Sequence, residues 1–298
     1  MSAEKTVQIF KRLDSGDFRT LLAIELGMGS YEYVPKNEII RFSELPPTKV
    51  DFHLNHLHIF GLIQRWVGSY TGYVLNTAGY DCLAINAAVK ANFLEALGKP
   101  IGLGKESDVY DALTPKGERV AVKFHRLGRI SFRQTRRARG YIAERRHISW
   151  LYQSRLAAEN EFQALLQLYS KEVSVPKPIF QNRHLILMGL IEGAPLAEYM
   201  DIPDPKSALL EILRNVRQAY IKAGIVHADL SEFNIIIRPD ERILIIDWPQ
   251  YVTIDHPNVD FLLQRDVQNT LSYFRRKFKV EIPIERALDF IKGKIKSI

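Results

Sequence analysis

The fold is decided by the stretch Gly224-Ile-Val-His227-Ala-Asp229-Leu-Ser-Glu-Phe-Asn234-Ile-Ile-Ile, followed by Arg-Pro-Asp-Glu-Arg and then by Ile243-Leu-Ile-Ile-Asp247-Trp248. It predicts an apolar strand end, a loop with the pattern His-x-Asp-x-x-x-x-Asn, a β-hairpin, and a strand that ends on an aspartate. Phosphoryl transfer needs a carboxylate near the attacking oxygen, and an amide and a second carboxylate to hold magnesium. Asp229, Asn234 and Asp247 can take these roles in that order. Each alone predicts only a turn residue, whereas the ordered set favours the phosphoryl-transfer motif.

The composition is that of an ordinary globular chain. Of 298 residues, 46% are hydrophobic and 25% are charged, which is enough apolar material for two domains. No apolar run is long enough to span a bilayer, and Met1-Ser-Ala-Glu-Lys lacks the apolar core of a signal peptide. We therefore expect a cytoplasmic protein with no membrane partner. Cys82, the single cysteine, lies in an apolar helical pattern, which predicts a buried thiol rather than a nucleophile.

The positive charge is concentrated in one segment. The net charge is +7, and residues 1–100 contain ten basic and ten acidic side chains. Residues 125–147 contain eight arginines and one glutamate and so hold the whole excess. Arginines at this density, with aromatic residues and glycines between them, are typical of a mobile arm that contacts phosphate backbones. The alternative is a solvated loop without a dedicated partner.

The first 97 residues predict helices and one hairpin. Amphipathic patterns cover residues 5–13, 18–28 and 36–43, with Asp17 as a plausible N-cap of the second helix. Thr48 can cap a fourth helix. A hairpin is expected over residues 62–76, and a last helix from Asn76 to about Leu97.

Three helices followed by a hairpin are typical of a winged helix-turn-helix. The zero net charge of this domain argues against strong duplex binding by the domain alone, so protein or structured-RNA contacts are an alternative. The spacing of its three neighbouring histidines does not favour metal binding. The hairpin over residues 62–76 is the wing of this fold. The candidate recognition surface combines polar and aromatic side chains of the fourth helix and the wing: Lys49, His53, Asn55, His56, His58, Arg65 and Tyr70.

A glycine-containing loop precedes a strand that carries a lysine. Residues 101–110 have the sequence Ile-Gly-Leu-Gly-Lys-Glu-Ser-Asp-Val-Tyr, and Val-Ala-Val-Lys123 follows later. This order predicts a strand, a phosphate-covering loop and two further strands. The Ser107 hydroxyl can meet phosphate oxygens, and Lys123 can reach the α and β phosphates. The pattern of a Walker P-loop is absent.

A periodic helix is expected over residues 154–169. It offers two glutamates, Glu159 and Glu161, either of which can form the ion pair with Lys123 that an active kinase requires. Further along, the apolar run over residues 184–193 predicts a buried strand that continues into a hinge. The backbone from Met188 to Leu190 can bond an adenine edge there, although core packing explains Met188 equally well.

Four stretches together resemble the RIO family of atypical serine/threonine protein kinases. They are residues 102–110, 125–133 (His-Arg-Leu-Gly-Arg-Ile-Ser-Phe-Arg), 227–234 and 245–250 (Ile-Ile-Asp-Trp-Pro-Gln). The winged-helix pattern points to the branch of this family that carries such a domain. The resemblance implies an α+β protein with a winged helix-turn-helix over residues 1–92 and a two-lobed, truncated protein-kinase-like domain over residues 93–298. Its N-lobe would span about 93–187, its hinge about 188–193 and its C-lobe about 194–298.

The resemblance also implies a role for each site residue. Asp229 is the catalytic aspartate, Lys123 pairs with Glu161, and Asn234 and Asp247 bind the metal. ATP and Mg²⁺, or Mn²⁺ in its place, are the implied cofactors. A phosphate carried briefly on Asp247 would accompany ATP turnover. The residues implied to contact the triphosphate are Lys105, Glu106 and Ser107.

The implied setting is maturation of the small ribosomal subunit. Pre-ribosomal RNA and proteins would be the partners, bound through residues 125–147 and the winged helix.

The sequence departs from ordinary protein kinases at three points. Ala228 replaces the arginine that contacts a phosphorylated activation loop, Asp247-Trp248-Pro249 replaces Asp-Phe-Gly, and only 51 residues follow Asp247. A free peptide substrate is therefore not expected, and Ser131 in the basic segment is the candidate for autophosphorylation.

Three alternatives stay open. A winged-helix nucleic-acid-binding regulator, whose kinase-like domain only senses nucleotide, would bind duplexes tightly and selectively. An aminoglycoside- or choline-type kinase shares the His-x-Asp-x-x-x-x-Asn loop, but it usually needs an acidic pocket, which the basic segment does not favour. A pseudokinase is disfavoured because every metal and phosphate group is present.

Overall fold

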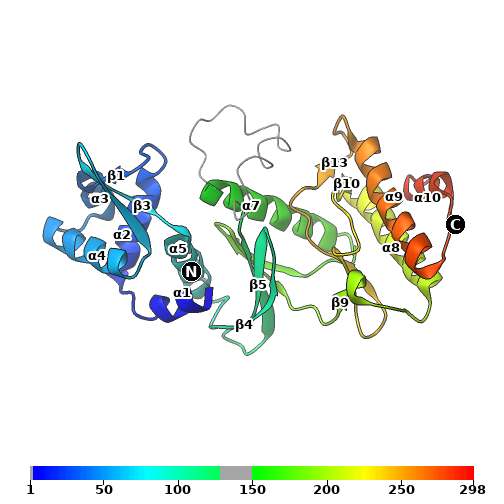
Figure 1. Cartoon of the computed structure of the whole chain (residues 1–298), viewed down its shortest axis with the longest axis horizontal. Helices are drawn as coiled ribbons and strands as arrows, with labels where there is room; N and C mark the ends of the chain where they lie inside the picture. Colours follow the sequence, from blue (N-terminus) through cyan, green and yellow to red (C-terminus); the bar gives the residue numbers. More distant parts are fainter. Residues whose placement is uncertain (1–2, 128–149) are drawn as a thin grey trace. The chain divides into compact units, whose positions relative to one another are not determined.

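The computed structural model describes residues 3–127 and 150–298 (Figure 1). The chain divides into two compact units, Met1–Leu156 with Gln181–Leu185, and Ala157–Phe180 with Ile186–Ile298. This division lies within the kinase-like part, so it does not test the predicted domain boundary at residue 92, which stays a prediction. In the described part of the chain, no helix has both the length and the hydropathy needed to cross a membrane.

The N-terminal part of the first unit is a helical domain with a small sheet. Its helices are α1 (Ala3–Phe10), α2 (Ser15–Gly27), α3 (Lys36–Ser43), α4 (Pro47–Ile59) and α5 (Thr77–Lys90). Strands β1 (Val34–Pro35), β3 (Thr71–Leu75) and β2 (Ile63–Val67) form an antiparallel sheet in that order. The expected helices and the wing hairpin are confirmed. They enclose one apolar core, whose fully buried members include Leu21, Ile39, Leu57 and Leu62.

The start of α2 differs from the expected one. Asp14, not Asp17, is the N-cap, and the two residues form a capping box. Asp14 Oδ1 accepts the Asp17 N–H at 2.9 Å, and Asp17 Oδ2 accepts the Asp14 N–H at 3.1 Å. The start of α4 differs too, because Pro46 holds the cap position and Thr48 lies inside the helix.

The end of α5 was also predicted wrongly. The helix ends at Lys90, not near Leu97. Asn92 takes a left-handed φ of 62°, a conformation that commonly ends helices. Strand β4 then begins at Ala96. The apolar residues after Lys90 fit a helical or an extended pattern equally well, so periodicity alone missed this end.

A five-stranded sheet follows the winged-helix domain. Its strands are β4 (Ala96–Leu103), β5 (Ser107–Leu113), β6 (Arg119–His125), β7 (Pro178–Asn182) and β8 (Leu185–Gly189), in the order β4-β5-β6-β8-β7. The β5–β6 register pairs Ser107 with His125 and Val109 with Lys123. The expected loop and lysine-carrying strand are therefore confirmed. The periodic helix also exists, as α7 (Trp150–Tyr169).

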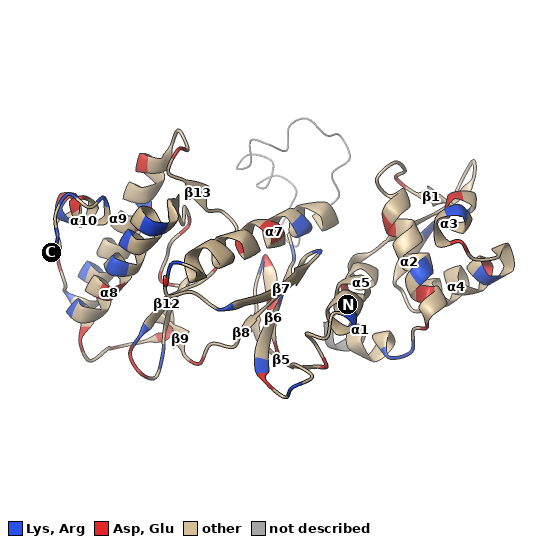
Figure 2. Cartoon of the chain, turned by 180° about the vertical axis from the view of Figure 1, so that it is seen from behind, with Lys and Arg blue, Asp and Glu red and all other residues tan. Residues whose placement is uncertain are grey.

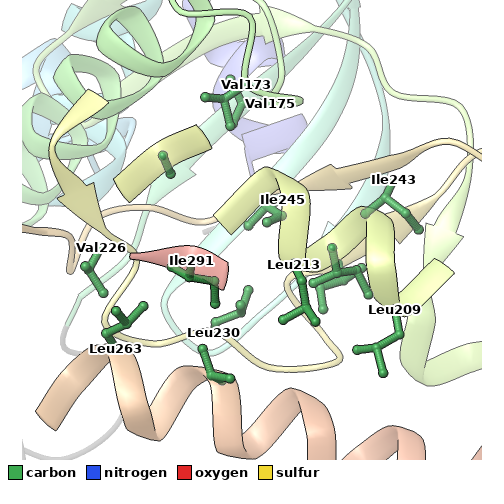
Figure 3. Packing of buried hydrophobic residues seen from close by; sticks show 14 of the residues in the cluster. Val173, Val175, Leu209, Leu213, Val226, Leu230, Ile243, Ile245, Leu263 and Ile291 are labelled. Carbon is green, nitrogen blue, oxygen red and sulfur yellow. The ribbon is translucent and has the colours of Figure 1, made fainter. Parts of the chain in front are cut away.

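The second unit contains the motif of residues 224–248 among short strands and long helices. The strands are β9 (Ala194–Pro195), β10 (Ile225–Val226), β11 (Ile235–Ile237), β12 (Ile243–Ile245) and β13 (Val252–Thr253). The helices are η2 (Leu196–Glu198), α8 (Pro205–Gln218), the π-helical turn η3 (Ala219–Ala223), α9 (Val259–Phe278) and α10 (Ile284–Ile291). Buried side chains of these elements form one core (Figure 3).

The helix α9 supplies one wall of this core. Leu263, Val267 and Phe274 are buried on it, and Figure 3 shows Leu263 beside Val226 from β10. Arg275, Arg276 and Lys277 lie in its last turn, and Figure 2 draws the Lys and Arg residues of this helix in blue. Cations at a helix C-terminus offset the helix dipole, so this basic cluster has a structural explanation.

Candidate active site

The loop 227–234 is fixed by the side chain of Asp266 on α9. Asp266 is 1% exposed. Its Oδ2 accepts the Ala228 N–H at 2.7 Å, and its Oδ1 accepts the Leu230 N–H at 3.3 Å. Arg265 Nη2 donates to the Ala228 carbonyl. Both N–H groups beside Asp229 are thus bound from α9, while the Asp229 side chain stays exposed.

Two residues of the motif have a strained backbone. Ala228 has a φ of 60° and Asp247 a φ of 67°. Non-glycine residues rarely take such values, and they persist only where surrounding contacts enforce them. At Ala228 those contacts are the bonds to Asp266 and Arg265. The left-handed backbone at Ala228 is therefore imposed by contacts with α9.

His227 ties the loop to the end of β12. Its Nε2 lies 2.9 Å from the Ile246 carbonyl oxygen, and the Asp229 N–H approaches Nδ1 at 3.3 Å. A carbonyl only accepts and an N–H only donates, so these bonds fit the neutral tautomer with its proton on Nε2. The ring also packs against the buried Trp248, with centroids 4.5 Å apart. His227 therefore sets the spacing between Asp229 and the strand end that carries Asp247.

The β11–β12 hairpin brings Asn234 and Asp247 to the same end of a strand pair. The register pairs Ile235 with Ile245. The Ile246 N–H donates to the Asn234 carbonyl at 2.9 Å, which extends this pairing by one step. Asp247 is the next residue. Asn234 Nδ2 donates to the Asp229 carbonyl at 2.9 Å, so the three predicted residues belong to one bonded framework.

The donor set fits a magnesium ion. Because Asn234 uses its amide nitrogen on the Asp229 carbonyl, its oxygen is the atom left to act as a ligand. Asp247 supplies carboxylate oxygens from the same hairpin end. Mg²⁺ prefers oxygen ligands and commonly takes one or two carboxylates together with substrate phosphates. Mn²⁺ in its place stays a prediction.

Asp266 was missed in the sequence because its partners are far away in the chain. Burial raises the pKa of its carboxyl from 3.8 to about 6, against the opposing effects of Arg265 and of the Leu230 and Ala228 N–H groups. A polar residue on the apolar face of an amphipathic helix was the only signal available. Such residues are more often explained by capping or by a local bond.

The predicted phosphate loop lies where β4 turns into β5. Lys105 and Glu106 are exposed, and Ser107 is half-buried. The Gly104 N–H donates to the Ser107 carbonyl at 2.8 Å, and the Arg126 N–H donates to the Glu106 carbonyl at 2.6 Å. The loop is thus fixed at its backbone and keeps two exposed side chains, although its contacts with a triphosphate stay predictions.

Lys123 and Glu161 are both buried, at 5% and 2% exposure. They belong to different units, so their ion pair stays a prediction. A buried lysine and a buried glutamate each need a charged or hydrogen-bonding partner, which is consistent with the predicted ion pair.

Met188 is 7% exposed and Leu190 is half-buried. The side chain of Met188 is therefore part of the core, while the predicted hydrogen bond between this backbone and adenine stays a prediction.

The predicted basic arm needs one correction. His125 ends β6, and Arg126 is 6% exposed within a network of ion pairs. His125 therefore belongs to the sheet, and Arg126 to the folded stretch that directly follows it, so neither is part of an arm. The interpretation failed because a local charge count cannot detect an acidic partner elsewhere in the chain. The remaining arginines of the segment, and Ser131, fall in residues 128–149, outside the described residues.

The candidate recognition surface needs a correction as well. His53 is buried, and its Nδ1 lies 2.9 Å from Asp17 Oδ1, so it cannot contact a partner. His56 Nδ1 also bonds Asp17, at 3.0 Å. Asp14, Asp17 and His53 lie close together, but helix capping and these bonds already explain the cluster. The surface keeps the exposed Lys49, Asn55, His58, Arg65 and Tyr70.

Comparison with known proteins places the chain in a family. The family model described as RIO domain matches residues 108–287, and the one described as Rio2, N-terminal, matches residues 10–91. The chain belongs to the RIO family, in its Rio2 branch. The predicted α+β fold and the predicted enzyme class, a RIO-type serine/threonine-protein kinase with a winged-helix domain, are thereby confirmed.

Relatives and solved structures cover nearly the whole RIO chain. The RIO-type serine/threonine-protein kinase Rio2 of Methanocaldococcus jannaschii is 42% identical over 274 residues, covering 89% of this chain and 99% of the relative. The serine/threonine-protein kinase rio2 of Schizosaccharomyces pombe is 40% identical over 280 residues, covering 93% and 81%. The crystal structure of the Rio2 kinase-ADP/Mg²⁺-phosphoaspartate complex from Chaetomium thermophilum superimposes with a TM-score of 0.83 at 33% identity, covering 97% and 93%.

Proposed function

We propose that this RIO-family chain is an Mg-ATP-dependent serine kinase and ATPase with Asp229, Lys123 and Asp247 as its catalytic residues. The observation that carries the proposal is the bonded framework of the motif. Asn234 Nδ2 holds the Asp229 carbonyl at 2.9 Å, and His227 Nε2 holds the carbonyl that precedes Asp247 at 2.9 Å. Preorganised groups of this kind are what positioning and electrostatic catalysis of phosphoryl transfer require.

The nucleotide would be held by groups from several elements. Lys105, Glu106 and Ser107 contact the triphosphate, and Lys123 binds the α and β phosphates in an ion pair with Glu161. The backbone of Met188 to Leu190 receives the adenine. Asn234 and Asp247 hold Mg²⁺, which supplies charge neutralisation of the phosphates when bound. The similarity to a Rio2 kinase solved with ADP and Mg²⁺ supports this choice of cofactor.

Two acceptors for the phosphoryl group are proposed. In the kinase reaction, a serine hydroxyl attacks the γ-phosphorus, its proton passes to Asp229, and the bond to the bridging oxygen breaks to release ADP. In the ATPase reaction, an Asp247 carboxylate oxygen attacks instead, and water later hydrolyses the acyl phosphate. The second route is supported by the similarity to a complex whose own description includes a phosphoaspartate.

The proposed setting is maturation of the small ribosomal subunit in the cytoplasm. Pre-ribosomal RNA and proteins are the proposed partners, bound through the basic segment and the winged helix. The charge distribution supports this, because residues 128–147, which exclude the ion-paired Arg126, contain seven arginines and one glutamate, and phosphate neutralisation drives binding to nucleic acids. Autophosphorylation at Ser131 within this segment is part of the proposal.

The test is Mg-dependent ATP hydrolysis by the purified protein, with and without small ribosomal subunits. We compare the wild type with Asp229→Asn and Asp247→Asn. Asp240→Asn is the matched control, since this exposed aspartate lies in the turn of the same hairpin. The expected result is hydrolysis that responds to the subunits and is lost in both motif variants but kept in the control.

Two further readouts separate the routes. A phosphoenzyme that hydroxylamine cleaves, and that is missing from Asp247→Asn, supports the acyl phosphate. Hydrolysis that survives both motif substitutions, or that never appears in the wild type, overturns the proposal. The chain would then be a nucleotide-sensing winged-helix regulator.

A further inference from the structure

His125, the last residue of β6, and the two residues after it donate backbone hydrogen bonds to three different parts of the chain. The His125 N–H donates to the His184 carbonyl at 2.9 Å, and the Arg126 N–H donates to the Glu106 carbonyl at 2.6 Å. The Leu127 N–H donates to Ser154 Oγ at 3.1 Å. This short stretch therefore connects the β7–β8 turn, the predicted phosphate loop and the start of α7.

The side chain of Arg126 extends this connection into the winged-helix domain. Its Nη1 and Nη2 donate to both carboxylate oxygens of Asp81, on α5, at 2.6 and 2.9 Å. Its Nε donates to Asp108 Oδ2, on β5, at 3.1 Å. The side chains of Arg126 and Asp81 are 4% and 1% exposed. Bidentate guanidinium–carboxylate pairs fix orientation as well as distance.

His184 completes the network as a neutral partner. Its Nε2 lies 2.7 Å from Asp81 Oδ1, and its buried Nδ1 has no hydrogen-bond partner among residues 3–127 and 150–298. Burial lowers the pKa of His184 despite the neighbouring Asp81. Tyr80 stacks on the ring, with centroids 4.7 Å apart. Arg126 is thus the cation that Asp81 and Asp108 share.

A network like this is a weak source of stability. Three charged groups must leave water, and an apolar replacement of similar volume is often as stable. The best-attested use of buried ion pairs is to select one arrangement of the groups they join. Here that arrangement includes the loop backbone at Glu106, which Arg126 bonds through its own N–H.

The loop 104–107 is short, and the bond from the Arg126 N–H to the Glu106 carbonyl is its anchor. The Gly104 N–H donates to the Ser107 carbonyl at 2.8 Å, and Ser107 pairs with His125 across β5 and β6. Arg126 is the residue after His125, and its N–H bond to the Glu106 carbonyl therefore extends the β5–β6 pairing by one residue into the loop. A shift of Arg126 would move the carbonyl between two of the predicted phosphate-contacting side chains.

We propose that Arg126, held by Asp81 of the winged-helix domain, is a positioning residue for the nucleotide loop 104–107. The winged-helix domain is then a structural component of the nucleotide site rather than a separate binding module. The inference rests on the proposed nucleotide contacts of Lys105, Glu106 and Ser107.

The chain offers a matched control for this proposal. Arg183, in the β7–β8 turn, donates from Nε and Nη2 to the two carboxylate oxygens of Glu25 on α2, at 2.7 and 2.5 Å. This second bidentate pair also joins the winged-helix domain to the sheet. None of the hydrogen bonds described for Arg183 leads to loop 104–107. Glu25→Gln therefore weakens the connection between the winged-helix domain and the sheet without removing a hydrogen bond of Arg126 or of loop 104–107.

The experiment measures the dissociation constant of Mg-ADP by titration calorimetry for the full-length wild type, Asp81→Asn and Glu25→Gln. Arg126→Lys is the second loop-anchor variant, because it keeps the charge and the backbone N–H but cannot form the bidentate bond. It keeps the proposal testable where Asp81→Asn does not fold. Thermal unfolding and hydrogen exchange at the amides of Gly104 and Arg126 are recorded for each variant.

The expected result is an increase in the Mg-ADP dissociation constant of about tenfold in the loop-anchor variants, the equivalent of about 1.4 kcal/mol. The KM for ATP should rise in parallel while kcat changes by less than about twofold. The amides of Gly104 and Arg126 should exchange faster. Glu25→Gln should lower thermal stability and leave nucleotide affinity unchanged.

Two outcomes overturn the inference. One is unchanged nucleotide affinity in Arg126→Lys and in any folded Asp81→Asn protein. The other is an equal loss of affinity in Glu25→Gln, which would show that general loosening of the junction is responsible. A wild type that does not bind Mg-ADP would instead contradict the proposed function, so the two failures are distinguishable.

Discussion

The carboxylate of Asp266 accepts the backbone N–H of Ala228 at 2.7 Å, so a buried residue of α9 holds the peptide group between His227 and Ala228, one residue before Asp229. The same carboxylate accepts the Leu230 N–H on the other side. An ionised carboxylate can accept both bonds, whereas an amide offers only one acceptor atom. The position of the Asp229 side chain therefore depends on the ionised form of Asp266.

Asp266→Asn should lower ATP turnover about 10²-fold, because small displacements of a catalytic group have effects of that size. Nucleotide affinity should change little, since Asp266 has no predicted nucleotide contact. Steady-state kinetics at saturating Mg-ATP measure the effect. Asp260→Asn is the control, because Asp260 lies on the same helix with a side chain that is 75% exposed. Equal kcat values for both variants would refute the assigned role.

The pKa of Asp266 also predicts a pH dependence of stability. Burial raises this pKa from 3.8 to about 6, so the folded protein binds the proton more tightly than the unfolded chain. The resulting stabilisation is fully present below the unfolded pKa and is lost as the pH rises through about 6. Between pH 4.5 and pH 7, Asp266 should lower the free energy of unfolding by about 2 kcal/mol.

Urea unfolding of the wild type and of Asp266→Asn at these two pH values tests this dependence. Other groups titrate equally in both proteins, so the difference between them isolates Asp266. The variant should lose less stability than the wild type between pH 4.5 and pH 7. Parallel losses in the two proteins would show that Asp266 titrates normally in the folded state.

Asn234→Ala should weaken the use of magnesium. The substitution removes a predicted oxygen ligand and the bond from Nδ2 to the Asp229 carbonyl. Loss of a ligand or of its support typically reduces metal affinity 10- to 100-fold. The Mg²⁺ concentration that gives half-maximal ATP turnover should therefore rise at least about tenfold. Asn269→Ala, at an exposed position of α9, should behave as the wild type. An unchanged Mg²⁺ requirement would remove Asn234 from the metal site.

Much of this framework could be predicted from the sequence because it depends on local patterns. The His-x-Asp-x-x-x-x-Asn loop, the strand that precedes Asp247 and the strand that carries Lys123 each leave a signal within a few residues. The β11–β12 hairpin then fixes Asn234 beside Asp247 by register alone. A short, strongly constrained connection leaves little freedom for the chain to do otherwise.

The parts that were missed depend on partners far apart in the chain. Arg126 looked like one member of an arginine-rich arm, because the pairing with Asp81 spans 45 positions. His53 looked like a surface residue, because its bond to Asp17 spans 36 positions. A helical pattern specifies which face a side chain occupies, but not which buried acid it meets. Polar residues on apolar faces are therefore the positions at which a single sequence is least informative.

The remaining arginines of the basic segment should control the salt dependence of binding to small ribosomal subunits. Replacing Arg133, Arg136, Arg137 and Arg139 by alanine removes four charges, which should make the slope of log K against log salt shallower by about 3. Co-sedimentation across a salt series measures that slope. Arg275→Ala with Arg276→Ala, in the last turn of α9, is the control for loss of basic charge elsewhere. If the control shifts the slope as much per charge removed, binding follows net charge and the segment has no special part in it.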